Sequence, residues 1–325
     1  MSVNAEKIRA YVYLALAMTT VGSIVPAAKV MAGELPPFVA GALRLAVAAA
    51  VLLPWAASRG GLAPIGGFDR HDKVLLALQA AAGTVGFTVL MILGTARTSA
   101  ADASVVTGTL PAVVTLVSVL LFREQPGRRR WLAIALATGG LAVVNLHTLN
   151  GGGLRRDRFL GNLLVLGAVV SESLFILLNK RLHRQLPALE QSAAMTGLGL
   201  LYVLPPALIE ANGLDLGAVA ARAYLAAVYY GLVPTVLGFV WWYKGTERVS
   251  GAEAGVFTGV MPIAGAGLSA LVLGERLGVH HLAGLGLVVA AIALAAGAGA
   301  PRRWRIPGTP DTLPVHHRAR VSSRS

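Results

Sequence analysis

The chain has 325 residues, of which 55% are hydrophobic and only 13% charged, and its formal net charge is +13. A soluble globule of this length would need far more charge to cover its surface, so composition excludes a water-soluble fold. The absence of cysteine excludes disulfides and thiolate metal sites. A mean hydropathy of +0.68 and apolar runs about as long as a bilayer is thick therefore predict an integral membrane protein.

Ten apolar runs predict an all-α fold with ten transmembrane helices. Only helices and closed barrels satisfy the backbone in lipid, and these runs are too long and too uniformly apolar for barrel strands. The expected spans are residues 11–31, 37–57, 74–95, 101–122, 131–146, 159–180, 189–210, 222–243, 252–273 and 281–300.

The sequence contains an internal repeat. Residues 94–124 recur without a gap as residues 245–275, with thirteen of the thirty-one positions identical. The same offset of 151 residues pairs Lys29 with Lys180, so the whole chain consists of two copies of one unit. Five helices in each copy is an odd number, which predicts an inverted repeat. Such folds bind their ligand near the midplane, between the halves, and are typical of transporters.

The repeat divides the chain into four parts. We expect a first five-helix repeat at 1–149, a flexible linker at 150–158, a second five-helix repeat at 159–300 and a disordered basic tail at 301–325. Twenty of the twenty-eight Lys and Arg residues fall on one side of the expected spans or in the tail. The positive-inside rule then places both termini in the cytoplasm.

Ionisable residues at bilayer depth are candidates for function because they are costly there. Glu172 lies about halfway along the sixth expected helix, and Asn179 shares its face. Desolvation of the Glu172 carboxylate would suit it to proton exchange, whereas a permanently protonated or arginine-paired structural acid is the alternative. Arg44, in the second expected helix, needs a carbonyl or a carboxylate, and Glu172 is one possible partner; a structural or gating role is favoured.

Further polar residues are placed along a substrate or ion pathway. Hydroxyls of the first helix share one face, and the repeat pairs a glutamine of the third helix with a tyrosine of the eighth. The set comprises Thr19, Ser23, Gln79, Tyr230, Thr107, Thr258 and Trp241. Trp241 also fits an interfacial aromatic belt.

Two pairs of equivalent residues have expected gating or structural roles. Pro111 and Pro262 follow Thr-Gly pairs and indicate matched flexible points in the fourth and ninth helices. Lys29 and Lys180 end helices on opposite sides of the membrane. Lysine at such positions usually extends to the headgroups, although twin cations at the two mouths also suit alternating gates.

These features resemble the drug/metabolite transporter superfamily, specifically the EamA-domain family of ten-helix bacterial metabolite exporters. The resemblance covers residues 10–298 and rests on Pro36-Pro37 followed by Arg44, and on the block 111–124 with its copy at 262–275. It implies a secondary carrier with a central cavity lined by helices 1, 3, 4, 6, 8 and 9. The chain departs from the family pattern at Met195, which replaces the second copy of Arg44, and in helix 1, where many relatives have a tryptophan.

The sequence therefore predicts a transporter that exports amino acids or related small metabolites across the inner membrane by alternating access, with possible proton coupling. A flippase for a lipid-linked phosphate carrier is the alternative. A membrane enzyme is not favoured, because no HExxH motif, aspartate pair or histidine at depth is present. The expected partners are a small-molecule substrate and membrane lipid, without nucleic acid, cofactor or metal, and the oligomeric state is a monomer or a homodimer.

Overall fold

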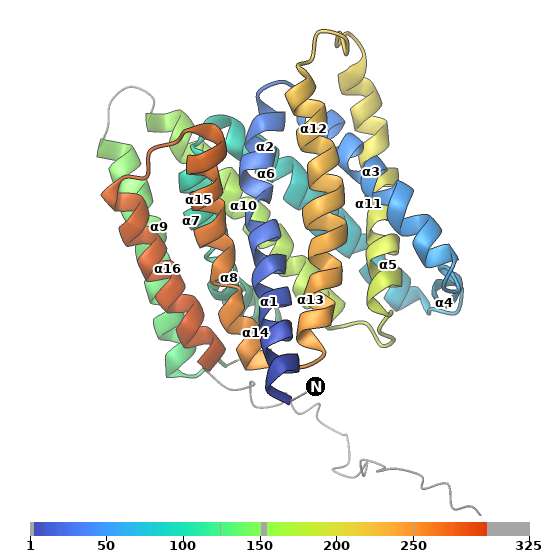
Figure 1. Ribbon diagram of the computed structural model, residues 1–325, viewed down its shortest axis with the longest axis horizontal. Coiled ribbons are helices and arrows are strands. Elements are labelled where there is room, and N and C mark those ends of the chain that lie inside the picture. Colours follow the sequence, from blue (N-terminus) through green and yellow to red (C-terminus); the bar gives the residue numbers. More distant parts are fainter. Residues whose placement is uncertain (1–2, 124, 151–154, 250, 298–325) are drawn as a thin grey trace, which may run out of the picture.

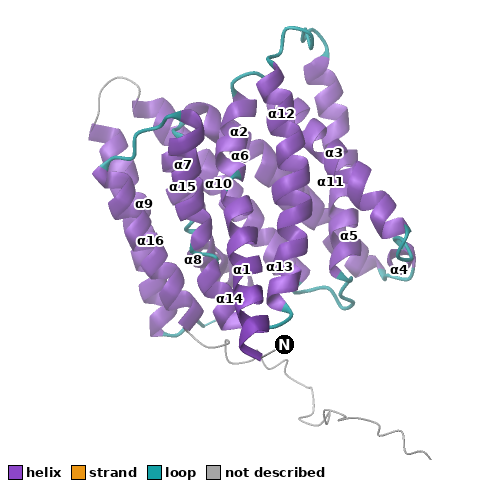
Figure 2. Ribbon diagram, in the orientation of Figure 1, coloured by secondary structure: helices purple, strands orange, loops and turns teal. Residues whose placement is uncertain are grey.

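The computed structural model describes residues 3–123, 125–150, 155–249 and 251–297, and all regular structure within these ranges is helical (Figures 1 and 2). The tail at 301–325 and residues 151–154 of the expected linker lie outside the described residues. The helices are α1 (Val3–Gly22), α2 (Ile24–Ala32), α3 (Pro37–Ala57), α4 (Ala63–Gly66), α5 (Arg70–Gln79), η1 (Ala80–Gly86), α6 (Phe87–Arg97), α7 (Ala100–Thr107), α8 (Leu110–Phe122), α9 (Arg128–Asn150), α10 (Arg155–Asn179), α11 (Ala188–Ala211), α12 (Ala221–Tyr230), η2 (Gly231–Leu237), α13 (Gly238–Thr246), α14 (Gly251–Phe257), α15 (Val260–Leu273) and α16 (Val279–Gly297).

Eight helical stretches among the described residues are long and apolar enough to cross a membrane. A ninth is added if α7 and α8, which meet at a bend of 48°, form one span. The remaining expected span corresponds to α9, which begins with the three arginines Arg128 to Arg130, and its membrane crossing stays a prediction. The sixth helix begins earlier than expected, because α10 already includes Arg155 to Arg158.

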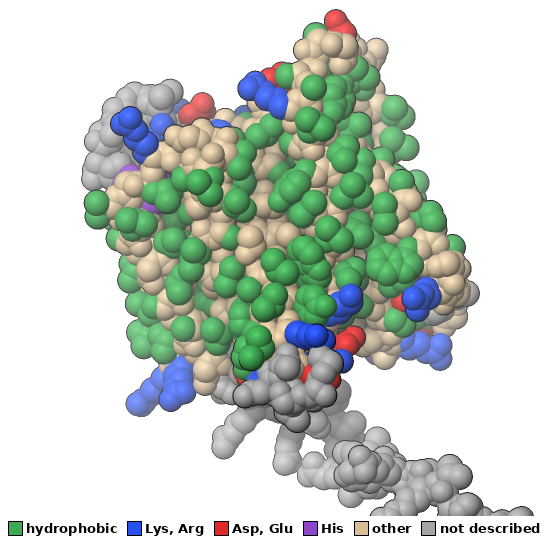
Figure 3. All heavy atoms as spheres, in the orientation of Figure 1, with side chains coloured by type: hydrophobic (Ala, Val, Ile, Leu, Met, Phe, Trp, Pro, Cys, Tyr) green, Lys and Arg blue, Asp and Glu red, His purple; other side chains and the backbone are tan. Residues whose placement is uncertain are grey.

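The surface has the distribution that a bilayer requires. Lys and Arg gather near the two ends of the bundle, whereas hydrophobic side chains cover the face between them (Figure 3). Large apolar side chains such as Leu120, Ile209 and Leu271 are exposed. In lipid this exposure carries no hydrophobic penalty, which explains why the chain has so few charges.

Helices 3 and 8 of the repeat each contain a π-helical segment at the same place. Segment η1 spans Ala80–Gly86 and η2 spans Gly231–Leu237, which are 151 residues apart at both ends. Pro234 within η2 has no N–H to donate, and Gly83 within η1 lets the Phe175 side chain of α10 approach. Segments of this kind are rare and often occur at functional sites.

Helices 4 and 9 are interrupted at the positions that the sequence predicts as flexible points. Helix α7 ends at Thr107 and α14 ends at Phe257, and α8 and α15 begin within three residues. Gly108, in the first interruption, packs so closely that an added Cβ would lie 2.5 Å from Val288 and 2.8 Å from Pro262. The interruptions are therefore also places where the two halves touch.

Small residues let the outer helices pack closely. Helix α16 lies beside α9 (Figure 1), where an added Cβ on Gly140 would lie 2.8 Å from the carbonyl oxygen of Gly284. The small residues of the last helix thus pack within the monomer. At the centre of the bundle, Gly22 of α1 similarly contacts the backbone of α15 at Met261 and Gly265.

Candidate substrate pathway

Arg44 is buried within the bundle and joins the two π-helical segments. Its guanidinium donates to the Thr84 carbonyl at 3.3 Å in η1 and to the Thr235 hydroxyl at 3.4 Å in η2. Thr84 and Thr235 are equivalent in the repeat, being 151 residues apart. Arg44 also donates to the Thr88 hydroxyl and stacks 4.5 Å from the ring centroid of Tyr230. One arginine of the first half therefore bonds to equivalent positions in both halves.

Glu172 is the acid that interacts electrostatically with this arginine. It lies on α10, next to Ser171, whose hydroxyl packs against Gly86 of η1. Its carboxylate is close enough to Arg44 and Tyr230 for electrostatic interaction, but it makes no hydrogen bond or ion pair with a described residue. As a residue Glu172 is half-buried, and its carboxylate is a charge that compensates Arg44 inside the bundle.

The expected polar pair of the third and eighth helices is fully buried, and its members contact different partners. Gln79 is 0% exposed and its side-chain oxygen accepts a hydrogen bond of 2.8 Å from Gln191 on α11. Tyr230 is 1% exposed and faces Arg44. Both residues directly precede a π-helical segment. They therefore contribute to the contacts around those segments.

Ser23 interrupts the first span, between α1 and α2. Its hydroxyl donates to the Thr20 carbonyl at 2.6 Å and accepts from the hydroxyl of Tyr229, on α12, at 2.8 Å. Thr19 instead donates to the Ala15 carbonyl of its own helix at 2.8 Å. The cross-half contact therefore involves Tyr229, a neighbour of the tyrosine singled out from the sequence.

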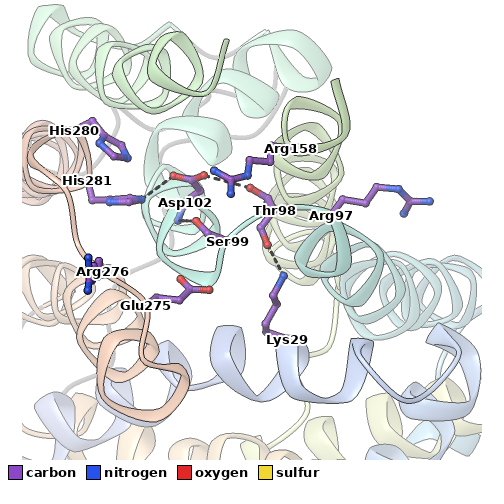
Figure 4. Close-up of a pocket in the computed structure, with 10 residues that line it drawn as sticks. All are labelled: Lys29, Arg97, Thr98, Ser99, Asp102, Arg158, Glu275, Arg276, His280 and His281. Carbon is purple, nitrogen blue, oxygen red and sulfur yellow. Dashed lines mark hydrogen bonds and ion pairs between the residues drawn. The ribbon is translucent and has the colours of Figure 1, made fainter. Parts of the chain in front are cut away.

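A pocket of about 500 Å³ opens at the end of the bundle where Lys29 lies, which we call the Lys29 mouth (Figure 4). Lys29 does not extend to the surface as the sequence favoured. It is half-buried, and its ammonium caps the end of α6 by donating to the Thr95 carbonyl at 2.6 Å and the Thr98 carbonyl at 2.8 Å. The lining comprises Lys29, Arg97, Thr98, Ser99, Asp102, Arg158, Glu275, Arg276, His280 and His281.

Two contacts at this mouth join the two halves of the chain. Glu275 accepts the N–H of Ala100 at 2.9 Å and of Ala101 at 2.8 Å, so its carboxylate caps the start of α7. Asp102 Oδ1 lies 2.9 Å from Nε2 of His281, at the start of α16, and both side chains are buried.

The opposite end of the bundle, which we call the Lys180 mouth, differs from the first. Lys180 is exposed, and its ammonium forms no hydrogen bond or ion pair with a described residue. Asn179 is half-buried, and its side-chain oxygen has no hydrogen-bond partner. The two equivalent lysines thus occupy different environments within a single conformation.

The remaining predicted residues lie along the helices without joining one site. Thr107 and Thr258 bond to carbonyls of their own helices, at 2.9 Å and 2.7 Å. Pro111 and Pro262 lie in the first turns of α8 and α15, and Trp241 is half-buried in α13. Of all the predicted pathway and gating residues, Lys29 alone belongs to the lining of the pocket.

Several residues of the Lys29 mouth were missed at the level of sequence. Asp102 lies in the first turn of α7, a common place for an acid, and His281 lies at the start of a span. One signal was available, because Asp102 is matched by Glu253 at the offset of 151. Glu253 binds Lys7 at 2.7 Å and accepts from Tyr11 at 2.7 Å. An acid at this place in both halves therefore contacts a residue outside its own helix.

Comparison with known proteins gives a family with this architecture. The model of the EamA-like transporter family matches residues 8–146 and 159–297. The "Uncharacterized transporter YetK" of Bacillus subtilis (strain 168) is 31% identical over 88% of this chain and 86% of its own length. The "Probable terminal-alkyne amino-acid exporter" of Streptantibioticus cattleyicolor is 28% identical over 57% of this chain and 60% of its own.

Two further comparisons agree. The "Probable amino-acid metabolite efflux pump" of Salmonella typhimurium is 26% identical over 54% of this chain and 60% of its own length. A chain in a solved structure described as "Crystal structure of protein" shares the fold with a TM-score of 0.56 at 19% identity, covering 90% of this chain and 97% of that one. With residues 8–146 and 159–297 both matched, this protein belongs to the EamA-like transporter family and is a multi-pass transporter of the inner membrane rather than an enzyme.

Proposed function

We propose that the protein is a secondary transporter that exports amino acids or related small metabolites by alternating access. Two of its relatives are named for amino-acid export and metabolite efflux. The proposal includes ten transmembrane helices in two inverted halves, residues 1–149 and 159–300, with both termini in the cytoplasm. The equivalent π-helical segments and the equivalent interruptions of helices 4 and 9 support this arrangement.

The observation that carries the proposal is the different bonding of two equivalent lysines. Lys29 caps α6 at its mouth, while Lys180 is exposed at the other. In an inverted repeat the two halves exchange conformations when access alternates. In the other conformation, Lys180 would therefore bind the carbonyls of Thr246 and Val249, which are equivalent to those of Thr95 and Thr98, and Lys29 would be released.

We further propose that Glu172 couples transport to protons. Its carboxylate interacts electrostatically with Arg44 yet has no hydrogen bond among the described residues. A proton or a cationic substrate group can therefore compete with the arginine for the same charge. Because Arg44 donates hydrogen bonds to both π-helical segments, a change in the charge of Glu172 would alter the contacts of Arg44 in both halves of the protein.

Counterflow in proteoliposomes tests the substrate class. Vesicles loaded with one unlabelled amino acid, nucleoside or sugar receive a trace of the same labelled compound outside, and protein-free vesicles are the control. We expect one or more amino acids to exchange and to saturate. If no amino acid or related metabolite in the panel exchanges, the exporter assignment is wrong.

A specific observation supports a second candidate, a flippase for a lipid-linked phosphate carrier. Arg158 and Arg276 line the pocket beside Lys29, and neither arginine has an acidic partner within the described chain. Such cations suit a phosphate. Flipping of a fluorescent polyprenyl phosphate, measured by dithionite quenching in the same vesicles, without amino-acid exchange would favour this candidate.

A further inference from the structure

Two histidines and two aspartates meet at the Lys180 mouth, outside the part of the chain considered for transport. Asp69, His71 and Asp72 lie at the start of α5, in the first half of the chain. His183 lies in the loop after α10, in the second half. One ligand atom from each of the four residues lies within 4.8 Å of the other three. The cluster therefore joins loops that are more than a hundred residues apart in sequence.

The distances between these atoms fit a metal ion at their centre. His71 Nδ1 lies 3.2 Å from Asp72 Oδ1, and His183 Nδ1 lies 3.1 Å from Asp69 Oδ2 and 3.7 Å from Asp72 Oδ1. In a tetrahedral site with bonds of ~2.0–2.2 Å, neighbouring ligand atoms are ~3.3–3.6 Å apart. These three separations are close to that range, and the other separations among the four ligand atoms are within 4.8 Å.

Backbone donors hold the two carboxylates in place. Asp69 Oδ1 accepts the N–H of Asp72 at 2.7 Å, which leaves Asp69 Oδ2 directed at His183. Asp72 is buried, and its two oxygens accept the N–H groups of His183 at 3.0 Å and Arg184 at 3.1 Å. Outer contacts of this kind orient ligands and are a regular part of metal sites.

The two imidazoles are arranged so that both can act as ligands. Their rings stack with centroids 4.5 Å apart and an interplanar angle of 16°, and both present Nδ1 to the carboxylates. Each Nε2 is then free to keep the ring proton, which is the tautomer that a ligand bound through Nδ1 requires. The side chains of His71 and His183 are 51% and 64% exposed, so an ion has a path from water.

A second cluster with similar residues does not meet these conditions. Asp102, His280 and His281 at the Lys29 mouth also bring three possible ligand atoms together. However, His281 Nδ1 accepts the N–H of Gly278 at 2.9 Å. The ring proton of His281 must then sit on Nε2, which faces Asp102, so that nitrogen is a donor and has no lone pair for a metal.

We propose that Asp69, His71, Asp72 and His183 form a site for a divalent transition-metal ion of the Zn²⁺ class. Two imidazoles and two carboxylates suit such an ion, and the carboxylates balance its charge without another acid. An ion bound here would tie the loop before α5 to the loop after α10 and so hold the two halves together at the Lys180 mouth. The site lies at the ends of the spans, and its ligands are split between the two halves of the chain, whereas no metal was expected from the sequence.

Metal binding to the full-length chain in nanodiscs tests the proposal. Titration with Co²⁺ alone should give the visible absorption of a tetrahedral complex at one ion per chain, and Zn²⁺ should displace it. We expect His183→Ala and His71→Ala each to weaken the affinity for Zn²⁺ by at least ~10-fold. Both side chains are exposed, so neither variant should disturb folding, and melting temperature without metal verifies this.

His280→Gln is the matched control, because it removes a histidine from the second cluster. It should bind Co²⁺ and Zn²⁺ as the unmodified chain does. The proposal is overturned if no Co²⁺ absorption appears, if binding survives in both His183→Ala and His71→Ala, or if it disappears in His280→Gln. These readouts do not involve transport, so they stand independently of the proposed function.

Discussion

Removing the carboxylate of Glu275 should open the Lys29 mouth. Glu275 accepts two N–H groups at the start of α7, at 2.9 Å and 2.8 Å, and thereby joins the second half of the chain to the first. A hydrogen bond to a charged group contributes about 1.5–3 kcal/mol. Because Glu275 is only half-buried, the lower value applies, and the two bonds together stabilise this contact between the halves by about 3 kcal/mol. Glu275→Ala should then shift the equilibrium towards the open mouth by up to ~150-fold.

The absence of cysteine from the chain provides a clean assay for this change. A single cysteine replaces Ser99, which lines the pocket, in both the parent and the Glu275→Ala background. The rate of its reaction with a hydrophilic maleimide is measured in nanodiscs. We expect faster labelling in Glu275→Ala, approaching the rate of a freely exposed thiol. Glu275→Gln should lie between the two, because its amide oxygen accepts an N–H but carries no charge. Equal labelling rates in the parent and in Glu275→Ala would refute the role of Glu275 in closing the mouth.

Three further predictions concern packing, the central arginine and pH. Gly22→Leu should lower the free energy of unfolding by ~1–3 kcal/mol, and with it the melting temperature, because the leucine side chain would collide with the Met261 carbonyl. Gly267→Leu should not lower it, because nothing lies within 4 Å of the Cβ position of Gly267. Arg44→Lys should reduce the rate of counterflow about tenfold. An ammonium cannot form hydrogen bonds to both π-helical segments, so the variant loses at least one bond of about 1.4 kcal/mol. Unchanged counterflow would contradict the bridging role of Arg44. Arg222, paired with Glu34 at 2.5 Å, lowers the pKa of that carboxyl. The pair therefore stabilises the fold at pH values above the ordinary pKa of glutamate. The difference in melting temperature between the parent and Arg222→Ala should shrink as the pH falls below that pKa. A difference that does not depend on pH would contradict this prediction.

The helices and the repeat could be predicted because membrane spans have strong local signals. Apolar runs of bilayer length identify helices without any knowledge of their neighbours. The Thr-Gly pairs and the prolines of the repeated block also predicted where helices 4 and 9 are interrupted, since proline and glycine act on the backbone where they occur. The π-helical segments were not foreseen, because η1 contains no proline and its geometry depends on packing against α10.

The site was less predictable, because its contacts join residues from opposite halves. Arg44 and Glu172 were singled out as ionisable groups at depth, yet the bonds from Arg44 to Thr84 and Thr235 depend on how three helices pack. Lys29 was expected to extend to the headgroups. Whether a lysine does so or caps a neighbouring helix depends on which carbonyls the fold brings within reach, and no local pattern encodes this.

The most direct test of the central claim compares exchange with gradient-driven transport in the parent and in Glu172→Gln. Proteoliposomes containing the amino acid identified by counterflow are assayed with and without an imposed pH gradient. If Glu172 couples transport to protons, the gradient accelerates transport by the parent alone, while Glu172→Gln, which cannot exchange a proton, retains counterflow. Equal acceleration of both proteins by the gradient would contradict the assignment of Glu172 as the coupling residue.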